Sequence, residues 1–367
     1  MKIPLHKPNW GEEEIQAVVE VMRSGRVTLG DKVRELEACF GEHAVMVNTG
    51  SSANLLAAAM LCNPAYPDHM NPGDEVIVSA LSWSTTVWPW VQYGIVPVLV
   101  DIDPDTLNID PAEILKAYSS KTRAIMPVHV YGNPCKMNEI NQIATDLDLF
   151  VVDDCCEAIG ADFPAHGNLS TYSFYFSHHI TALHGGMIVA ENNKQADLLR
   201  VLRGYGWIRE MKAPVYYEGI DPKFTFINAG YNLMPPETSA AMGLVQMNKL
   251  DRFVRTRRDI AKYLQYIFRP YSIKCQADAG GSSWFGFPIM AERALREHFE
   301  EDGIETRPII CGNIARQPGM KLWPHRIVGD LSNANHVMDH WFAIPCNQGM
   351  TIGDCDYIEE SIKRFYE

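Results

Sequence analysis

Three short segments of this 367-residue chain combine residue types and spacings that could do chemistry. The first, Asn48-Thr49-Gly50-Ser51-Ser52-Ala53-Asn54, follows a β-rich run and begins a helical one. Such a turn exposes backbone N–H groups at the positive end of a helix, with hydroxyls beside them, and this arrangement suits a phosphate. Plain helix capping uses the same residue types, so the sequence leaves both interpretations open.

The second segment, Asp153-Asp154-Cys155-Cys156-Glu157, follows the apolar run Phe150-Val151-Val152. Open α/β sheets bind their ligands at the carboxyl ends of such strands. A carboxylate there stays ionised when it faces a cation, for example a protonated ring nitrogen. The alternative is that these carboxylates cap the next segment.

The third segment, Ser173-Phe174-Tyr175-Phe176-Ser177-His178-His179, precedes the pair Gly185-Gly186. Two histidines after a strand could form a metal site, supply a general base, or be satisfied polar groups at the strand end. A zinc site needs a third ligand, and neither His184 nor any neighbouring carboxylate supplies an obvious one. The sequence therefore predicts no metal site.

The elements that must position these segments alternate between β-rich and helical runs. Helical spacing over residues 11–24 begins the pattern. The predicted strands are 44–48, 75–79, 96–101, 123–130, 150–153, 171–176 and 186–190. This alternation, with continuously apolar strands, predicts an α/β fold whose sheet is mainly parallel and covered on both faces.

The chain changes character after about Pro236. A long helical pattern through Leu244, Met247, Leu250 and Ile260 leads to a smaller α+β region. We place the domain boundary inside this helix. The prediction is a large domain over residues 1–245 and a small C-terminal domain over residues 246–367.

Composition narrows the partners and the compartment. The formal net charge is −13, which disfavours nucleic acid and anionic membrane surfaces. The apolar stretch 87–100 is interrupted by Pro89, Gln92, Gly94 and Pro97 and is too short to span a membrane. The start of the chain shows no apolar signal core, and the nine cysteines include no CxxC pair. A cytoplasmic location is expected.

Taken in order and spacing, these motifs resemble the DegT/DnrJ/EryC1/StrS family of sugar aminotransferases. The similarity extends over nearly the whole chain. It rests on NTGSSAN at 48–54, Trp83, PVHVYG at 127–132, Asp153-Asp154, SFYFSHH at 173–179, Gly185-Gly186 and Gly230-Tyr231-Asn232. The resemblance implies a fold-type I transferase that uses pyridoxal 5′-phosphate (PLP), with a large mixed sheet and a small C-terminal domain.

The family's residue roles carry over to matching positions. The resemblance implies that Asp154 pairs with the pyridinium nitrogen, that Trp83 stacks on the ring and that Glu157 lies near the ring oxygen. The phosphate is assigned to the turn at Gly50, to the backbone of Ser51 and Ser52, and to the Ser173 hydroxyl. Asn232 is expected to reach the phosphate of a neighbouring subunit, which implies a homodimer with shared active sites. Arg209 is a candidate for anion recognition, the alternative being a surface arginine at a helix end.

One position departs from most of the family. His178 occupies the place of the lysine that forms the Schiff base, and no lysine lies between Lys136 and Lys194. An imidazole cannot form that imine, so the substitution resembles the dehydratase branch. The expectation is a 3-dehydratase (a lyase) for a nucleotide-linked 4-keto-6-deoxy sugar such as GDP-4-keto-6-deoxymannose, in deoxysugar and O-antigen biosynthesis. His178 would act as base and then acid, and L-glutamate would convert PLP to pyridoxamine 5′-phosphate (PMP).

Other departures and alternatives remain. His184 and Met234 stand where the family usually has glutamate and arginine. No cysteine lies between Cys156 and Cys275, which disfavours the iron–sulfur relatives. The alternatives are an aminotransferase that recruits a lysine from elsewhere, and a cofactor-binding or sensor protein that has lost catalysis.

Overall fold

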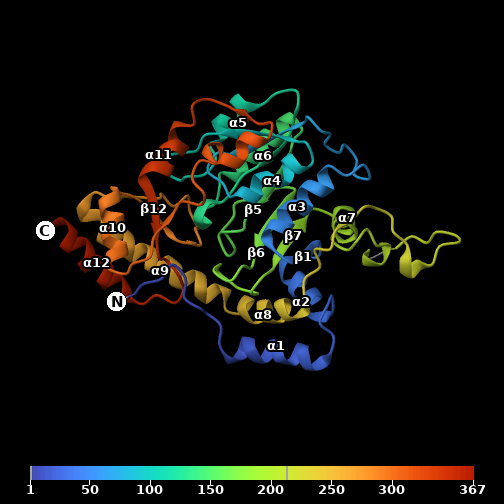
Figure 1. The fold of residues 1–367 in the computed structure, drawn as a ribbon, viewed down its shortest axis with the longest axis horizontal. Helices are drawn as coiled ribbons and strands as arrows, with labels where there is room; N and C mark the ends of the chain where they lie inside the picture. Colours follow the sequence, from blue (N-terminus) through green and yellow to red (C-terminus); the bar gives the residue numbers. More distant parts are fainter. Residues whose placement is uncertain (1, 212–213) are drawn as a thin grey trace.

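The larger of two β-sheets forms the centre of the molecule (Figure 1). The computed structural model describes residues 2–211 and 214–367. The sheet order is β1-β7-β6-β5-β4-β2-β3-β11, and only β7 pairs antiparallel with its neighbours. Its strands are β1 (Ala44–Val47), β2 (Glu75–Ser79), β3 (Val96–Val100), β4 (Thr122–Met126), β5 (Phe150–Asp154), β6 (Leu169–Ser173), β7 (Gly186–Ala190) and β11 (Arg326–Ile327). The predicted α/β class with a mostly parallel sheet is confirmed.

Helices cover both faces of this sheet, which explains why its strands are continuously apolar. Along β2, Val76 and Val78 pack into the core beneath α3 and α7, whereas Ile77 packs on the other side with α5 and α6. This alternation follows from the two-residue period of a strand. The covering helices are α3 (Gly50–Leu61), α4 (Ser84–Gln92), α5 (Pro111–Ala117), α6 (Met137–Leu147) and α7 (Asn193–Arg203).

The C-terminal part builds a smaller antiparallel sheet of order β10-β12-β9-β8. Its elements are β8 (Lys274–Cys275), β9 (Phe287–Met290), α10 (Arg293–Glu301), β10 (Arg307–Pro308), α11 (Ser332–His340), β12 (Trp341–Ile344) and α12 (Ile352–Tyr366). β11, from the same part of the chain, pairs instead with β3 at the edge of the large sheet. The domain boundary at residue 245 stays a prediction.

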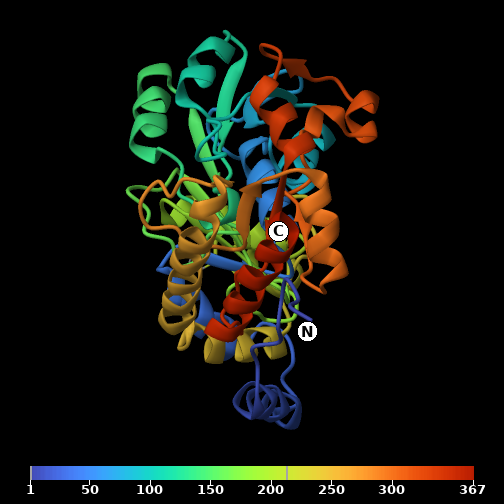
Figure 2. The same ribbon diagram turned by 90° about the vertical axis from the view of Figure 1, so that its left-hand side faces the viewer.

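The long helix expected across this boundary is instead two helices, α8 (Glu237–Met247) and α9 (Leu250–Phe268). Asn248 and Lys249 form a turn between them. Asparagine is a weak helix former, and the Lys249 ammonium lies 2.7 Å from a carboxylate oxygen of Glu13 and of Glu14. These carboxylates belong to α1 (Glu12–Ser24), which packs on α8 and projects from the body (Figure 2). The next helix, α2 (Asp31–Phe40), also packs on α8.

A second difference concerns the strand expected at 171–176, because β6 spans Leu169–Ser173. After Ser173 the chain leaves the sheet and returns to it at β7. Residues 174–185 form a loop between the two strands, which we call the histidine loop. Backbone bonds from Phe174 N–H to Gly185 C=O and from Ala182 N–H to Phe174 C=O close this loop. His178 therefore lies beyond the strand end.

Both chain ends lie on the side of the small sheet (Figure 1). Ile3 forms a parallel bridge with Ile304, and Asn347 Nδ2 donates to the carbonyls of Pro4 and Leu5. From there the chain runs on to α1, so residues 2–11 form a strap across the small domain. Short 3₁₀ turns complete the structure at Val130–Gly132, Ile208–Glu210, Pro222–Phe224, Arg269–Tyr271, Ile314–Arg316 and Pro318–Leu322.

Two observations concern the chain's surroundings. All nine cysteines are free. Within residues 2–211 and 214–367, no helix combines the length and apolarity that crossing a lipid bilayer requires.

Candidate active site

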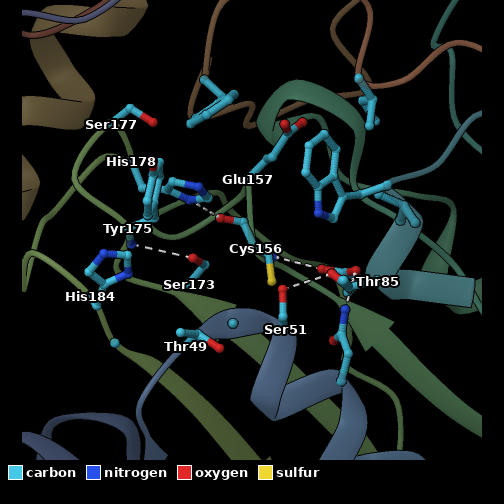
Figure 3. A pocket seen from close by; sticks show the side chains of 18 of the residues that line it. Thr49, Ser51, Thr85, Cys156, Glu157, Ser173, Tyr175, Ser177, His178 and His184 are labelled. Atoms are coloured by element: carbon cyan, nitrogen blue, oxygen red, sulfur yellow. Dashed lines mark hydrogen bonds between the residues drawn. The ribbon is translucent and has the colours of Figure 1, made fainter. Parts of the chain in front are cut away.

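A cavity of about 370 Å³ opens where β5 and β6 end and α3 begins (Figure 3). It brings together residues from both sheets and from the histidine loop. Its wall includes these sequence-predicted residues: Gly50, Ser51, Trp83, Asp154, Glu157, Ser173 and His178. Further wall residues are Thr49, Asn54, Thr85, Val128, Cys156, Tyr175, Ser177, His184, Gly185, Phe285, Arg307 and Ile310.

The first turn of α3 forms one end of the cavity. Thr49 caps the helix by accepting the Ser52 N–H at 3.0 Å, so the N–H groups of Gly50 and Ser51 have no acceptor within the helix. A Cβ on Gly50 would lie 2.6 Å from the Cβ of Ser173, which shows how closely this turn approaches β6. The Ser51 hydroxyl lies 2.9 Å from that of Thr85. Two N–H groups and adjacent hydroxyls thus converge on one small space, as an anionic group requires.

Ser52, by contrast, supports the turn from behind. Its hydroxyl lies 2.6 Å from Asn48 Oδ1 and 2.8 Å from Thr49 Oγ1, and the residue does not line the cavity. Its backbone N–H, which the sequence assigned to the phosphate, instead donates to Thr49 Oγ1, and its side chain belongs to the same capping network.

Asp154 presents a buried carboxylate to the cavity. Its Oδ2 atom accepts hydrogen bonds from Asn54 Nδ2 at 2.9 Å and Thr86 Oγ1 at 2.7 Å, and Oδ1 accepts the Cys156 N–H at 3.1 Å. The Asn54 amide is oriented in turn by Thr171, whose hydroxyl donates to its Oδ1 atom. Three hydrogen-bond donors hold this carboxylate in one orientation at the cavity wall. Asp154 can therefore pair with a cationic ring nitrogen.

His178 is held in one tautomer by the backbone. Its Nδ1 atom lies 2.6 Å from the carbonyl oxygen of Cys156 (Figure 3), and a carbonyl only accepts, so Nδ1 carries the hydrogen. In the neutral ring Nε2 then has a free lone pair. The ring packs against Phe285, with centroids 4.9 Å apart.

The surroundings of His178 keep it neutral. Burial lowers its pKa to about 4, the positive charges of Arg307 and Arg257 and the nearby His6 act in the same direction, and the hydrogen bond to Cys156 opposes them. At neutral pH the imidazole is therefore a base that is ready to accept a proton at Nε2.

Glu157 lies on the opposite side of the cavity from Thr49 and Ser51 (Figure 3). Burial raises its pKa to about 7, against the opposing effects of Arg307 and of the Tyr131 N–H, which donates to Oε2 at 3.1 Å. Arg307 Nη2 lies 3.8 Å from Oε1. Glu157 can hold or release a proton near neutral pH.

The small domain holds the histidine loop in place through His179. His179 Nε2 donates to the Ser283 carbonyl at 3.0 Å, and the His179 carbonyl accepts the side-chain amides of Asn9 at 3.4 Å and Gln348 at 3.2 Å. Arg257, which is buried, orients Gln348 by donating from Nε to its Oε1 atom at 2.7 Å.

Arg257 also organises the chain beside His178. Its Nη1 group donates to the carbonyls of Trp284, Phe285 and Cys346 at 2.8, 3.1 and 2.7 Å. The ring that packs on His178 is thereby fixed from the small domain. One buried guanidinium therefore links α9 to both supports of the histidine loop.

Besides Ser52, two further predicted residues, Asn232 and Arg209, do not line the cavity within this chain. Asn232 is exposed and forms a bridge with Gly204. The Arg209 guanidinium lies over the Trp207 ring, 3.5 Å from its centroid, and lines a separate hollow with Arg203 and Glu210.

Sequence reasoning missed several residues of the site. Asn54 is the last residue of the segment 48–54, and Thr85 lies two residues after Trp83. Their positions in these motifs could have predicted that they belong to the site. Arg257 and Gln348 carried none, because their contacts with the site join residues about 90 or more positions apart in the chain. Arg307 belongs to none of the motifs considered in the sequence, and it reaches the cavity from β10.

Residues 8–363 match the model of the DegT/DnrJ/EryC1/StrS aminotransferase family. The GDP-4-keto-6-deoxy-D-mannose 3-dehydratase of Escherichia coli O55:H7 is 34% identical over 386 aligned residues, covering 98% of this chain and 99% of that protein.

Two solved structures of GDP-4-keto-6-deoxymannose-3-dehydratase are also similar. One holds a trapped PLP-glutamate geminal diamine, with a TM-score of 0.93, 33% identity, and coverage of 98% of this chain and 100% of that one. The other is a histidine-to-asparagine mutant with bound GDP-perosamine, with a TM-score of 0.92, 33% identity, and coverage of 98% and 99%.

Proposed function

This chain belongs to the DegT/DnrJ/EryC1/StrS aminotransferase family, and we propose that within it the protein is a PLP-dependent 3-dehydratase. Its substrate is a nucleotide-linked 4-keto-6-deoxy sugar, with GDP-4-keto-6-deoxymannose as the leading identity because the similar enzymes act on that sugar. The observation that carries the proposal is His178, a neutral imidazole in the cavity wall at the position where the family pattern has lysine.

The cavity fits PLP at both ends of the cofactor. The turn at Gly50 and Ser51 offers N–H groups for the phosphate, and Gly50 must lack a side chain for the turn to approach Ser173. Asp154 offers a carboxylate to the ring nitrogen, and Trp83 lines the same space. When bound, PLP supplies a carbonyl that accepts an amino group and a ring that withdraws electrons from the attached carbon.

The remaining chemistry belongs to His178. The Nδ1–H group is fixed on the Cys156 carbonyl, so Nε2 is free to accept a proton. It can take that proton from the carbon attached to the cofactor ring and then return it to the C3 hydroxyl of the sugar as that oxygen leaves. The Cys156 bond keeps the ring in the same orientation for both transfers. One residue thus supplies a base and then an acid.

L-Glutamate is the proposed amino donor, since the similar enzyme was trapped with it. We also propose a homodimer. The segment after α7, which extends from the body (Figure 1), exposes an unusual number of large apolar side chains. They are Tyr205, Val215, Tyr216, Tyr217, Ile220, Phe224, Phe226 and Ile227. A second copy would cover them and could bring Asn232 and Arg209 to its neighbour's cavity.

We propose a cytoplasmic location for the reaction, and the nine free cysteines support it because they suit a reducing compartment.

The decisive experiment is incubation with PLP, L-glutamate and GDP-4-keto-6-deoxymannose. Ammonia and a 3-deoxy-4-keto product are expected in equal amounts. If neither ammonia nor a 3-deoxy product forms with any of several 4-keto nucleotide sugars, the proposal is wrong.

An aminotransferase that recruits a different lysine is the alternative enzyme. The residues that the structure places in the cavity wall include no lysine, which argues against it. Borohydride reduction of the PLP-loaded protein discriminates the two, because only the aminotransferase would retain cofactor covalently.

A further inference from the structure

Two exposed histidines lie side by side on α11, outside the cavity. His336 and His340 are four positions apart, so both side chains lie on the same face of the helix. Their ring centroids are 4.6 Å apart, and the ring planes are tilted by 43°. Two histidines at this helical spacing can bind one metal ion, as they do in zinc enzymes that carry His-Glu-x-x-His on a helix.

A methionine sulfur adds a third donor to this pair. The Nε2 atom of His336 lies 3.2 Å from the sulfur atom of Met290, the last residue of β9. Bonds from a metal ion to nitrogen and to sulfur are about 2.0 and 2.3 Å long, so one ion can contact both atoms. Thioether sulfur is a soft ligand of the kind that selects Cu(I), and imidazole also binds copper. We propose that His336, His340 and Met290 bind a Cu(I) ion.

The three donors are available and uncharged. Among the residues that the structure describes, the Met290 sulfur is the one hydrogen-bond partner of the two imidazole rings. Asp339, which precedes His340, pairs with Arg316 at 2.8 Å. The ligand set is therefore two neutral imidazoles and a thioether, which suits an ion of single charge. Both histidines are exposed, so the ion can enter directly from solvent.

Backbone contacts hold the donors together before an ion binds. The Ala291 N–H, next to Met290, donates to the His340 carbonyl at 3.2 Å. Met290 itself pairs with Trp341, which follows His340, in the antiparallel ladder of β9 and β12. Such preorganisation reduces the entropy cost of binding. In the unfolded chain Met290 is separated from the histidines, so Cu(I) should bind the folded state more tightly and stabilise it.

The test titrates Cu(I), kept reduced with ascorbate and buffered by bicinchoninate, into the full-length PLP-loaded protein without oxygen. All proteins carry Cys39→Ser, because the exposed thiol of Cys39 also binds Cu(I). His336→Gln and His340→Gln should each raise the Kd for Cu(I) by at least about 100-fold, because loss of a ligand costs more than loss of a residue that only supports one. Unchanged affinity in both variants overturns the proposal.

Met290→Leu tests the choice of metal. Leucine keeps the apolar shape of the side chain and removes the sulfur, so the Kd for Cu(I) should rise at least about tenfold. The Kd for Zn²⁺, measured in the same variant, should change less than about twofold. If Met290→Leu leaves Cu(I) binding unchanged, the sulfur is no ligand and the assignment to Cu(I) is wrong.

Two controls complete the experiment. His325→Gln removes a histidine outside the pair, whose ring contacts the Trp323 carbonyl, and it should leave the Kd for Cu(I) unchanged. Cu(I) should raise the melting temperature of the Cys39→Ser protein but not that of its His340→Gln variant; equal shifts would contradict the site. None of the three ligands lines the cavity, so the result is independent of the proposed function.

Discussion

His178 and Asp154 are both bonded to the backbone of one residue, Cys156. The Asp154 carboxylate accepts the Cys156 N–H at 3.1 Å, and the His178 imidazole donates to the Cys156 carbonyl at 2.6 Å. The spacing between the proposed ring-nitrogen partner and the proposed base is therefore set by main-chain geometry. It does not depend on the side chain at position 156.

Replacing His178 with asparagine should abolish dehydration while preserving cofactor binding. The asparagine amide can still donate toward the Cys156 carbonyl, but it has no lone pair that accepts a proton at neutral pH. A loss of about 10²–10⁴-fold in kcat is expected for a removed acid–base group. Product formation and the absorbance of bound PLP measure the two effects. His184→Asn is the matched control, because His184 also lines the cavity; a larger loss there would move the base to His184.

Gln348 should affect turnover more than substrate affinity. Gln348→Leu removes one donor to the His179 carbonyl and leaves Arg257 Nε without its acceptor. The histidine loop then loses a support, and we expect kcat to fall about tenfold, since small misplacements of a catalytic group are costly. KM for the sugar nucleotide should change less than about threefold. Gln16→Leu, which removes an exposed contact with Glu20, serves as control. Equal values of kcat in both variants would contradict the positioning role.

Gly50→Ala should weaken PLP binding severely. Its Cβ would lie 2.6 Å from the Ser173 Cβ and 3.1 Å from the Cys156 sulfur, so the turn must move away from β6. We expect at least about a tenfold rise in the Kd for PLP, followed by absorbance. Gly353→Ala is the matched control at the start of α12, where the nearest atom would be Thr351 Oγ1 at 3.7 Å. Identical PLP affinities would show that the turn does not hold the cofactor.

Glu157 should make the cofactor-free protein less stable at alkaline pH. Burial raises its pKa from 4.5 to about 7, so its contribution is fully present below pH 4.5 and is lost as pH rises through 7. The shift corresponds to about 3 kcal/mol. Compared with Glu157→Gln, the wild type should lose up to that amount of unfolding free energy between pH 5 and pH 8, measured in urea. Parallel pH profiles for the two proteins would contradict the raised pKa.

The sequence supported the fold well wherever the signal was local. Runs such as Val76-Ile77-Val78 are strands because every residue of β2 is buried. Neighbouring side chains of a strand point to opposite faces, so the two carboxylates at the end of β5 have different surroundings. Asp154 lines the cavity, whereas Asp153 forms hydrogen bonds with His166 and Ser170. Such alternation is readable from sequence.

Contacts between residues far apart in the chain could not be predicted from the sequence. Helical spacing continues through Asn248 and Lys249, but the structure places a turn there, and Lys249 forms ion pairs with Glu13 and Glu14 of α1. In the sequence Arg257 looks like an ordinary charged residue on an amphipathic helix. In the structure it is buried and donates hydrogen bonds to four acceptors. Such roles arise only after the two domains meet, because no local pattern records them.

The two side-chain amides that donate to the His179 carbonyl are more than 300 positions apart in the sequence, Asn9 in the strap and Gln348 ahead of α12. During synthesis Asn9 emerges before Gln348, so both hydrogen bonds to the His179 carbonyl can form only after Gln348 has been made. A chain still on the ribosome can complete most of the large sheet but not this junction. Closure over so long a sequence separation should be among the slow steps of folding.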